Sequence, residues 1–188
     1  SLYVAKPSSC GRVVPTLEAK LVDEFDNEVP PGETGELCVR GAIVIKGYRN
    51  RPEATADSIR DGWFHTGDVA RIDEDGFGVI VDRIQDMVLR GGENVYCSEG
   101  EAAIDGLGGG AEVAVFGVPD DRLGEIVGAA IVLAPGAAMT EDQLRSALGS
   151  HLAKFKIPER VWFLNDALPR NANGKFVKRD LKDSLLGA

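Results

Sequence analysis

The sequence predicts an α+β fold, in which a β-rich piece precedes a small α+β domain with a mixed sheet flanked by helices. Of the 188 residues, 44% are hydrophobic and 27% are charged, which are ordinary values for a globular protein. Short strands and turns fill the first part, and strands alternate with helices after Val81. This change places a boundary near 83–86 and predicts two domains, residues 1–84 and 85–188.

Strands and turns account for the beginning of the chain. Apolar residues alternate with charged or polar residues over 17–21 and again over 36–40, a pattern typical of two half-buried strands. Residues 27–35 lie between them and are rich in Pro and Gly, which predicts a turn.

A helix and a hairpin are expected next. Asn50 can cap a helix that has an early proline, Pro52, and that runs to about Arg60. The apolar runs 69–72 and 77–81 flank an Asp-Glu-Asp-Gly sequence, and this arrangement predicts a hairpin.

Helix-start signals are clearest in the second part of the chain. Ser98 with Glu101, and Thr140 with Gln143, have the spacing of capping boxes, so each pair is expected to begin a helix. The other predicted elements are strands over 113–118, 126–133 and 161–164, a helix face of Leu144, Leu148 and Leu152, and a terminal helix carrying Val177, Leu181 and Leu185.

Charge and composition exclude several classes of protein. The chain has 21 basic and 30 acidic residues, a formal charge of -9, which argues against a main role in binding nucleic acid or an anionic membrane. No apolar run is long enough to span a bilayer, and the N-terminus lacks the pattern of a signal peptide.

Neither a disulfide framework nor a metal site is expected. The cysteines, Cys10, Cys38 and Cys97, are odd in number and far apart, which predicts a reducing, cytoplasmic setting without disulfides or a zinc site. His65 and His151 are also far apart, with no ligand partners at suitable spacing.

Two glycine-containing segments could contact a ligand. Asp68 follows Gly67, so its carboxylate could accept hydrogen bonds from vicinal hydroxyls, such as those of a ribose. A helix-to-strand turn would explain the same residues. Gly91 and Gly92 would let the backbone lie against a thin ligand or turn tightly, although an interdomain linker followed by a hairpin is the alternative.

A basic segment near the end of the chain could serve an anionic ligand. Residues 154–183 contain eight basic and four acidic residues, an excess that suits a nucleotide or CoA, or is simply a solvated helix face. Lys175 ends the polar loop 169–175. A lysine on a mobile loop suits an anionic transition state, and an exposed loop lysine without a function is the alternative.

In combination and in this order, the segments resemble the C-terminal part of the adenylate-forming superfamily, which includes acyl-CoA synthetases, luciferases and peptide-synthetase adenylation domains. The resemblance covers essentially the whole chain, and its motifs are residues 47–55, 66–68, 82–96, 117–125, 154–158 and 169–175. Residues 90–96 look most like those of fatty-acyl or aryl-acyl CoA ligases.

The resemblance implies an ATP-dependent carboxylate–CoA ligase that uses ATP, Mg²⁺ and CoA, and forms an acyl-adenylate and then an acyl-CoA thioester. It implies that Asp68 and Arg83 bind the nucleotide ribose and that Lys175 is the catalytic lysine bridging the carboxylate and the α-phosphate. Gln85 falls at the hinge, where the family usually has Asp or Lys. The Gly91-Gly92 pair is expected to line the CoA tunnel. A peptide-synthetase-type module and a non-catalytic folded fragment are the alternatives.

The resemblance also implies how the chain is organised. Residues 1–84 correspond to the end of the large N-terminal domain, and residues 85–188 to the small mobile domain. The phosphate loop and the carboxylate pocket are expected in an N-terminal part that precedes Ser1, so the chain alone is expected to be inactive. The expected partners are that part, a carboxylate and CoA. In bacterial members, a lysine acetyltransferase acting on Lys175 is a further possible partner.

Overall fold

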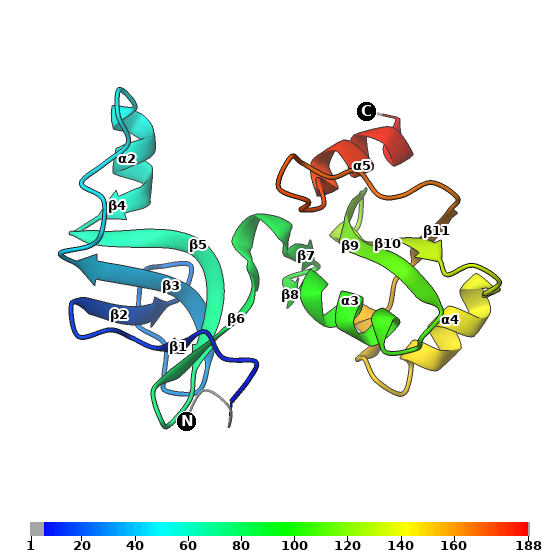
Figure 1. Cartoon of the computed structure of the whole chain (residues 1–188), viewed down its shortest axis with the longest axis horizontal. Coiled ribbons are helices and arrows are strands. Elements are labelled where there is room, and N and C mark those ends of the chain that lie inside the picture. Colours follow the sequence, from blue (N-terminus) through cyan, green and yellow to red (C-terminus); the bar gives the residue numbers. More distant parts are fainter. Residues whose placement is uncertain (1–5, 188) are drawn as a thin grey trace. The chain divides into compact units, whose positions relative to one another are not determined.

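The computed structural model describes residues 6–187 and divides into two compact units, Ser1–Gln85 and Asp86–Ala188 (Figure 1). The division falls one residue after the boundary expected from the sequence. Each unit has its own sheet, and the mixed α+β character is the one that the sequence predicts. In the described part of the chain, no helix is long and apolar enough to cross a membrane.

The first unit is built on an antiparallel sheet with the strand order β1-β6-β5-β3-β2, and β4 pairs with β5. Its strands are β1 (Gly11–Arg12), β2 (Leu17–Val22), β3 (Thr34–Gly41), β4 (Ile59–Arg60), β5 (Trp63–Ile72) and β6 (Phe77–Arg83). The predicted early strands and the predicted hairpin are confirmed as β2, β3 and the β5–β6 pair. Their apolar positions, Val22, Cys38, Val69 and Phe77 among them, are buried because the alternating pattern gives the sheet one apolar face.

The helix of the first unit, α2 (Pro52–Ser58), is shorter than predicted and starts differently. Its N-cap is Arg51, whereas Asn50 adopts a left-handed conformation with φ 56° and does not cap the helix. The helix ends at Ser58 because Ile59 pairs with Phe64 in the sheet. Tertiary pairing thus overrides the helical pattern that the sequence continues to Arg60.

The second unit has a five-stranded mixed sheet with the order β11-β10-β7-β8, and β9 pairs with β10. The strands are β7 (Val88–Arg90), β8 (Glu93–Val95), β9 (Gly110–Asp120), β10 (Gly124–Leu133) and β11 (Arg160–Leu164). The helices are α3 (Cys97–Asp105), α4 (Glu141–Leu148) and α5 (Lys178–Leu186), with 3₁₀ turns η1 (Ile84–Asp86), at the boundary between the units, and η2 (Lys154–Lys156). Among the described strands of this sheet, the β10–β11 pair alone is parallel, and its crossover contains α4.

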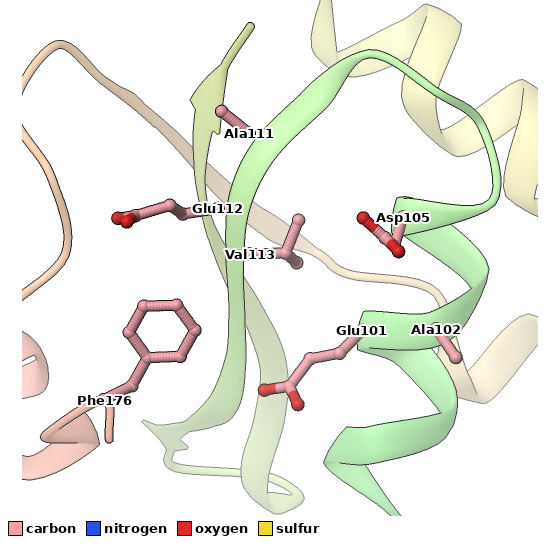
Figure 2. Close-up of a pocket in the computed structure, with 7 residues that line it drawn as sticks. All are labelled: Glu101, Ala102, Asp105, Ala111, Glu112, Val113 and Phe176. Atoms are coloured by element: carbon pink, nitrogen blue, oxygen red, sulfur yellow. The ribbon is translucent and has the colours of Figure 1, made fainter. Parts of the chain in front are cut away.

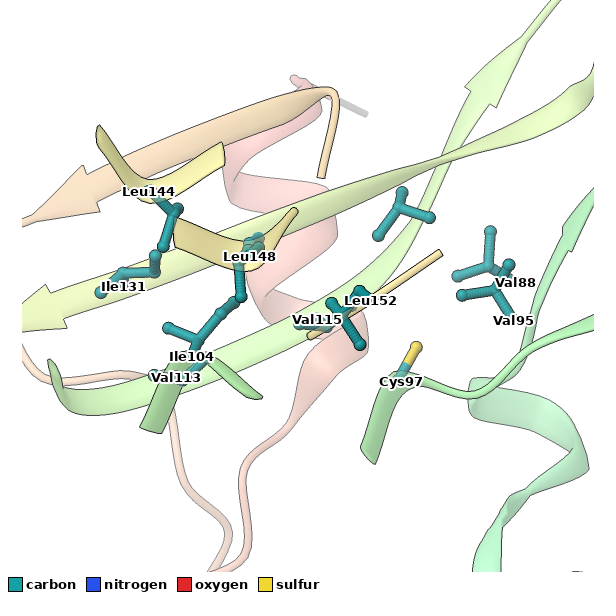
Figure 3. Packing of buried hydrophobic residues seen from close by; sticks show 12 residues of the cluster. Val88, Val95, Cys97, Ile104, Val113, Val115, Ile131, Leu144, Leu148 and Leu152 are labelled. Carbon is teal, nitrogen blue, oxygen red and sulfur yellow. The ribbon is translucent and has the colours of Figure 1, made fainter. Parts of the chain in front are cut away.

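Both faces of the β9–β10 pair are covered, which explains why the central residues of these strands are apolar. On one face, Val113 and Val115 pack with residues of α3 and α4, such as Ile104 and Leu144 (Figure 3). On the other face, Ala114, Phe116 and Val118 pack with Leu181 of α5. Adjacent residues of one strand therefore belong to two different hydrophobic clusters.

One predicted capping box is confirmed and the other is wrong. The Thr140 hydroxyl accepts a bond from the Gln143 N–H at 3.2 Å, and the Gln143 side chain accepts one from the Thr140 N–H at 2.9 Å. Helix α3 instead begins at Cys97 with Tyr96 as its N-cap. In the part of the chain that the structure describes, no side chain caps this helix, and Glu101 Oε1 accepts the Val115 N–H at 2.9 Å and pairs with Lys178.

Two small residues of α3 have packing roles in the second unit. Gly100 is buried, and a Cβ atom there would lie 3.3 Å from Cγ2 of Val115, so glycine lets α3 approach β9 closely. Cys97 is also buried, and its thiol donates to the carbonyl oxygen of Asp86 at 2.8 Å. The helix thus loses some intrinsic stability at Gly100 but gains a close contact with the sheet.

Candidate functional site

Asp68 and Arg83, the predicted nucleotide-binding residues, lie side by side at the end of the β5–β6 hairpin. They are register partners in the antiparallel pair, and Arg83 Nε donates to Asp68 Oδ1 at 3.2 Å. The side chains are 33% exposed for Asp68 and 56% for Arg83, so both can still reach a ligand. A carboxylate beside a guanidinium offers an acceptor and a donor to a pair of neighbouring hydroxyls.

The backbone around Asp68 is held by side chains of its own segment and of β3. Thr66 Oγ1 accepts the Asp68 N–H at 3.1 Å and donates to the Leu37 carbonyl at 2.7 Å. Gly67 has φ 73° and gives its N–H to Glu36 Oε1 at 3.1 Å. These residues form an irregularity within β5, so the alternative of a helix-to-strand turn is wrong.

The Gly91-Gly92 pair forms the two-residue turn of the β7–β8 hairpin. Arg90 and Glu93 are register partners, and both glycines have positive φ, 58° and 90°. Two successive positive φ values are the requirement of a type I′ turn, which glycine meets without strain. The Gly91 N–H donates to the Leu123 carbonyl at 2.8 Å, so the turn is tied to the beginning of β10.

Gln85 is exposed in the short 3₁₀ turn η1, and the division between the two compact units falls directly after it. The residue thus lies where a hinge would have to be, as the resemblance implies.

Lys175 is exposed at the end of a compact loop. The Asn171 side chain accepts the Lys175 N–H at 3.0 Å, and the Asn171 N–H donates to the Lys175 carbonyl at 2.9 Å. Gly174, with φ 79°, completes the turn before the lysine. Among the described residues, no ion pair involves Lys175, so its ammonium group is available to a ligand.

Arg170 and Glu112, which the sequence did not single out as site residues, fix the base of this loop. Arg170 donates to the Gly174 carbonyl and to Glu112 Oε1, each at 2.7 Å. Its guanidinium also lies 4.1 Å from the ring centroid of Phe176. Glu112 Oε2 accepts the Leu168 N–H at 2.7 Å. The hydrogen bond from Arg170 and, to a smaller extent, the one from the Leu168 N–H lower the pKa of Glu112. The carboxylate is therefore charged at neutral pH.

A pocket of about 280 Å³ lies between α3 and β9, close to the loop (Figure 2). Three acidic side chains and the ring of Phe176, the residue after Lys175, contribute to its lining. The lining residues are Glu101, Ala102, Asp105, Ala111, Glu112, Val113 and Phe176. None of the residues predicted from the sequence to bind ligands lines it. Two of its carboxylates already have cationic partners, Arg170 for Glu112 and Lys178 for Glu101.

Lys178 anchors the beginning of α5 to α3. Its Nζ lies 2.8 Å from Glu101 Oε1, and its side chain is mostly buried. Burial would lower the pKa of Lys178, but its interactions with Cys97 and with the carboxylates of Glu101 and Asp86 raise that pKa above the usual value. The lysine therefore stays charged and holds the segment that follows the Lys175 loop.

Two family models match the chain. The model described as AMP-binding enzyme matches residues 2–49, and the model described as AMP-binding enzyme C-terminal domain matches residues 99–175. Together they cover about two thirds of the chain and include Lys175.

Several curated relatives share close to half of their aligned residues with the chain. A long-chain-fatty-acid–CoA ligase of Salmonella typhimurium is 48% identical over 179 residues, which is 95% of this chain and 32% of that protein. A feruloyl-CoA synthase of Amycolatopsis is 46% identical over 165 residues, 88% of this chain and 33% of the relative. A fatty acid–[acyl-carrier-protein] ligase of Streptomyces coeruleorubidus is 42% identical, with coverage of 95% and 34%. The chain thus spans about a third of the length of these relatives.

Solved structures match as well. ATP-bound MatB from Rhodopseudomonas palustris is 42% identical, with a TM-score of 0.88 and coverage of 94% of this chain and 35% of that one. The o-succinylbenzoate CoA synthetase of Bacillus subtilis with its acyl-adenylate is 35% identical, with a TM-score of 0.86 and coverage of 97% and 37%. Apo MatB from R. palustris matches over 95% of this chain and 36% of its own at a TM-score of only 0.67. The same relative therefore has two different arrangements over the region that the chain covers.

Proposed function

Because the chain belongs to the AMP-binding, adenylate-forming enzyme family, we propose that it is the C-terminal portion of an ATP-dependent carboxylate–CoA ligase, most similar to fatty-acid–CoA ligases. The high identity to a long-chain-fatty-acid–CoA ligase supports this proposal, as does the feruloyl-CoA synthase. In the proposed reaction, a carboxylate attacks the α-phosphate of ATP and releases pyrophosphate. The thiol of CoA then displaces AMP from the acyl-adenylate.

The observation that carries the proposal is the Asp68–Arg83 pair. Its geometry fits a ribose, because Asp68 can accept both hydroxyl protons while Arg83 donates to a ring or hydroxyl oxygen. The ATP-bound and acyl-adenylate-bound neighbours support a nucleotide in this family. Asp68 already pairs with a guanidinium, so we assign no Mg²⁺ ligand in this chain and place the metal and triphosphate sites mostly in the rest of the protein.

We assign the two half-reactions to two segments of the second unit. Lys175, exposed and without an ion-pair partner among the described residues, offsets the negative charge that develops during adenylation. The Gly91-Gly92 turn presents backbone without side chains, which suits a wall of the narrow tunnel for the pantetheine arm of CoA. Rotation at Gln85 exchanges the two segments, residues 85–188 being the mobile small domain and residues 1–84 the end of the large domain. The two arrangements of MatB support such a motion.

A second function has one specific observation in its favour. A similar relative is named as a ligase of fatty acids to acyl carrier protein, so a carrier-bound pantetheine could replace free CoA as the acceptor. The chemistry of both steps would be the same.

We further propose a cytoplasmic location, which three cysteines outside any disulfide support, and modification of Lys175 by a lysine acetyltransferase. The exposure of the loop supports access for such an enzyme, and acetylation would remove the charge that adenylation needs.

The test compares the longer protein with the 188-residue chain. With ATP and a fatty acid, the longer protein should release pyrophosphate, and it should form a thioester with CoA. The chain alone should release none, since it covers about a third of its relatives. Transfer to acyl carrier protein but not to CoA would favour the second function. Pyrophosphate release from the chain alone at the rate of the longer protein, or from neither, would contradict the proposal.

A further inference from the structure

Three side chains with metal-binding atoms converge in the sheet of the first unit. Glu36 and Cys38 are two positions apart on β3, so they lie on the same face of the strand. His65 on β5 is the register partner of Cys38. The thiol sulfur, a ring nitrogen of His65 and a carboxylate oxygen of Glu36 all lie within 4.8 Å of one another.

The spacing of these atoms is close to that of a tetrahedral site. His65 Nδ1 lies 2.8 Å from Glu36 Oε2 and 3.3 Å from Cys38 Sγ. Zinc bonds of about 2.0–2.3 Å at tetrahedral angles separate neighbouring ligand atoms by roughly 3.3–3.6 Å. The side chains are 7% exposed for His65 and 14% for Glu36, and Cys38 is fully buried, so two paired strands hold the three ligands in place.

Arg60 brings a positive charge to the point where these atoms converge. Its NH2 group lies 2.6 Å from His65 Nδ1, 3.7 Å from Glu36 Oε2 and 3.2 Å from Asp26 Oδ1. If Nδ1 accepts a bond from Arg60, it carries no proton to donate to Glu36 Oε2, although the two atoms lie 2.8 Å apart. Two acceptors at this distance repel one another unless a cation lies beside both of them. Arg60 and Asp26 are each 46% exposed, so the guanidinium can move into solvent at little cost.

We propose that Glu36, Cys38 and His65 form a binding site for a divalent transition metal, and that Arg60 takes the place of the metal cation when no metal is bound. A thiolate, an imidazole and a carboxylate together are typical ligands of zinc, and they do not suit Mg²⁺ or Ca²⁺. Asp26, whose Oδ1 lies 4.0 Å from His65 Nδ1, or a water molecule would complete four-coordination.

The rest of the strand pair supports the orientation of the ligands. The Gly67 N–H donates to Glu36 Oε1, which leaves Oε2 directed at His65.

Burial and, to a smaller extent, the nearby Glu36 raise the pKa of the Cys38 thiol to about 11. The thiol is therefore protonated at neutral pH, and the metal must displace this proton, which passes to water.

Cobalt(II) is the probe of choice, because a bound thiolate gives a charge-transfer absorption band in the near ultraviolet. The chelator-treated 188-residue chain should develop this band on addition of Co²⁺ and lose it on addition of Zn²⁺. Cys38→Ser should abolish the band. Cys97→Ser is the matched control, because Cys97 is also buried and outside any disulfide but lies in the other unit, and it should leave the band unchanged.

Arg60→Ala gives an independent test on an exposed residue, so it does not depend on how Cys38→Ser folds. Without Arg60 the ion no longer has to displace a guanidinium from its position, so Co²⁺ binding should tighten about tenfold. The proposal is wrong if the unsubstituted chain shows no band up to about 1 mM Co²⁺, if Cys38→Ser keeps the band, or if Arg60→Ala fails to tighten binding. In each of these cases the cluster is an ion-pair network alone.

Discussion

Lys175 and Arg170 are five residues apart in one loop, but their contacts indicate different roles. Arg170 is engaged by a carbonyl, a carboxylate and an aromatic ring, so it is part of the scaffold. Within residues 6–187, Lys175 is bonded through its backbone alone, to Asn171, and its side chain is exposed. At the scale of single residues, the loop is thus a fixed frame that carries one movable charge.

In the longer protein, Lys175→Ala should slow adenylation by about 10²–10³-fold, because one electrostatic stabiliser of the transition state is lost. Thioester formation from supplied acyl-adenylate should be nearly unchanged. Pyrophosphate release and acyl-CoA formation measure the two steps separately. Lys182→Ala, another lysine of the same unit, is the control and should affect neither, whereas equal losses in both steps for Lys175→Ala would contradict the assignment.

The contacts of Arg170 predict a positioning role. Arg170→Ala should lower kcat for adenylation by about tenfold to a hundredfold through misplacement of Lys175, with little change in KM for ATP. Arg170→Lys should restore part of the rate, since it keeps the charge facing Glu112. Equal losses in adenylation and in thioester formation from acyl-adenylate would indicate a general loss of structure instead.

At the scale of elements, the sequence predicts strands and hairpins well, because alternation reports directly which face is buried. The prediction fails where a residue that fits a local motif uses its side chain to bond a residue far away in the sequence. Glu101 has the spacing of a capping box, but Val115 and Lys178, 14 and 77 positions away, use its carboxylate. The family resemblance singles out Asp68 and Arg83 as the proposed nucleotide-binding residues, whereas the Arg170–Glu112 contact joins segments 58 residues apart and leaves no local pattern.

The Gly91-Gly92 turn provides a prediction about an element. With φ 58°, an alanine at Gly91 would cost about 1–2 kcal/mol, and its Cβ would lie 3.0 Å from Leu123 Cδ2. In the longer protein, Gly91→Ala should therefore slow thioester formation more than adenylation. Gly108→Ala has comparable backbone strain, with φ 74° and open space around the new methyl group. Gly108→Ala should lower the free energy of unfolding by a similar amount, which denaturant titration measures. It should not slow one half-reaction more than the other.

At the scale of the whole molecule, each unit has its own sheet and its own buried residues, and the chain passes from one to the other at Gln85. This organisation suits the two half-reactions and the moving domain that we propose. If Gln85 is the hinge, a change there should alter the proposed motion while both units stay folded.

Gln85→Pro should restrict φ and remove an N–H at the proposed pivot. In the longer protein we expect slower thioester formation and a smaller effect on adenylation, provided that the adenylation arrangement is the one that proline tolerates. Gln85→Ala is the control, since it removes the side chain without restricting the backbone, and it should leave both rates close to those of the unsubstituted protein. Wild-type rates in both steps for Gln85→Pro would place the pivot elsewhere.

The covering of the β9–β10 pair on both faces has a consequence for amide hydrogen exchange. Helices α3 and α4 shield one side of these strands and α5 the other, so local opening of one helix leaves the amides that bond between the two strands in place. Exchange at Phe116 therefore requires the second unit to unfold as a whole, whereas Val115, whose N–H donates to Glu101 of α3, can exchange when α3 opens. The slowest-exchanging amides of this unit should report its global stability directly, and they should do so independently of any motion at Gln85.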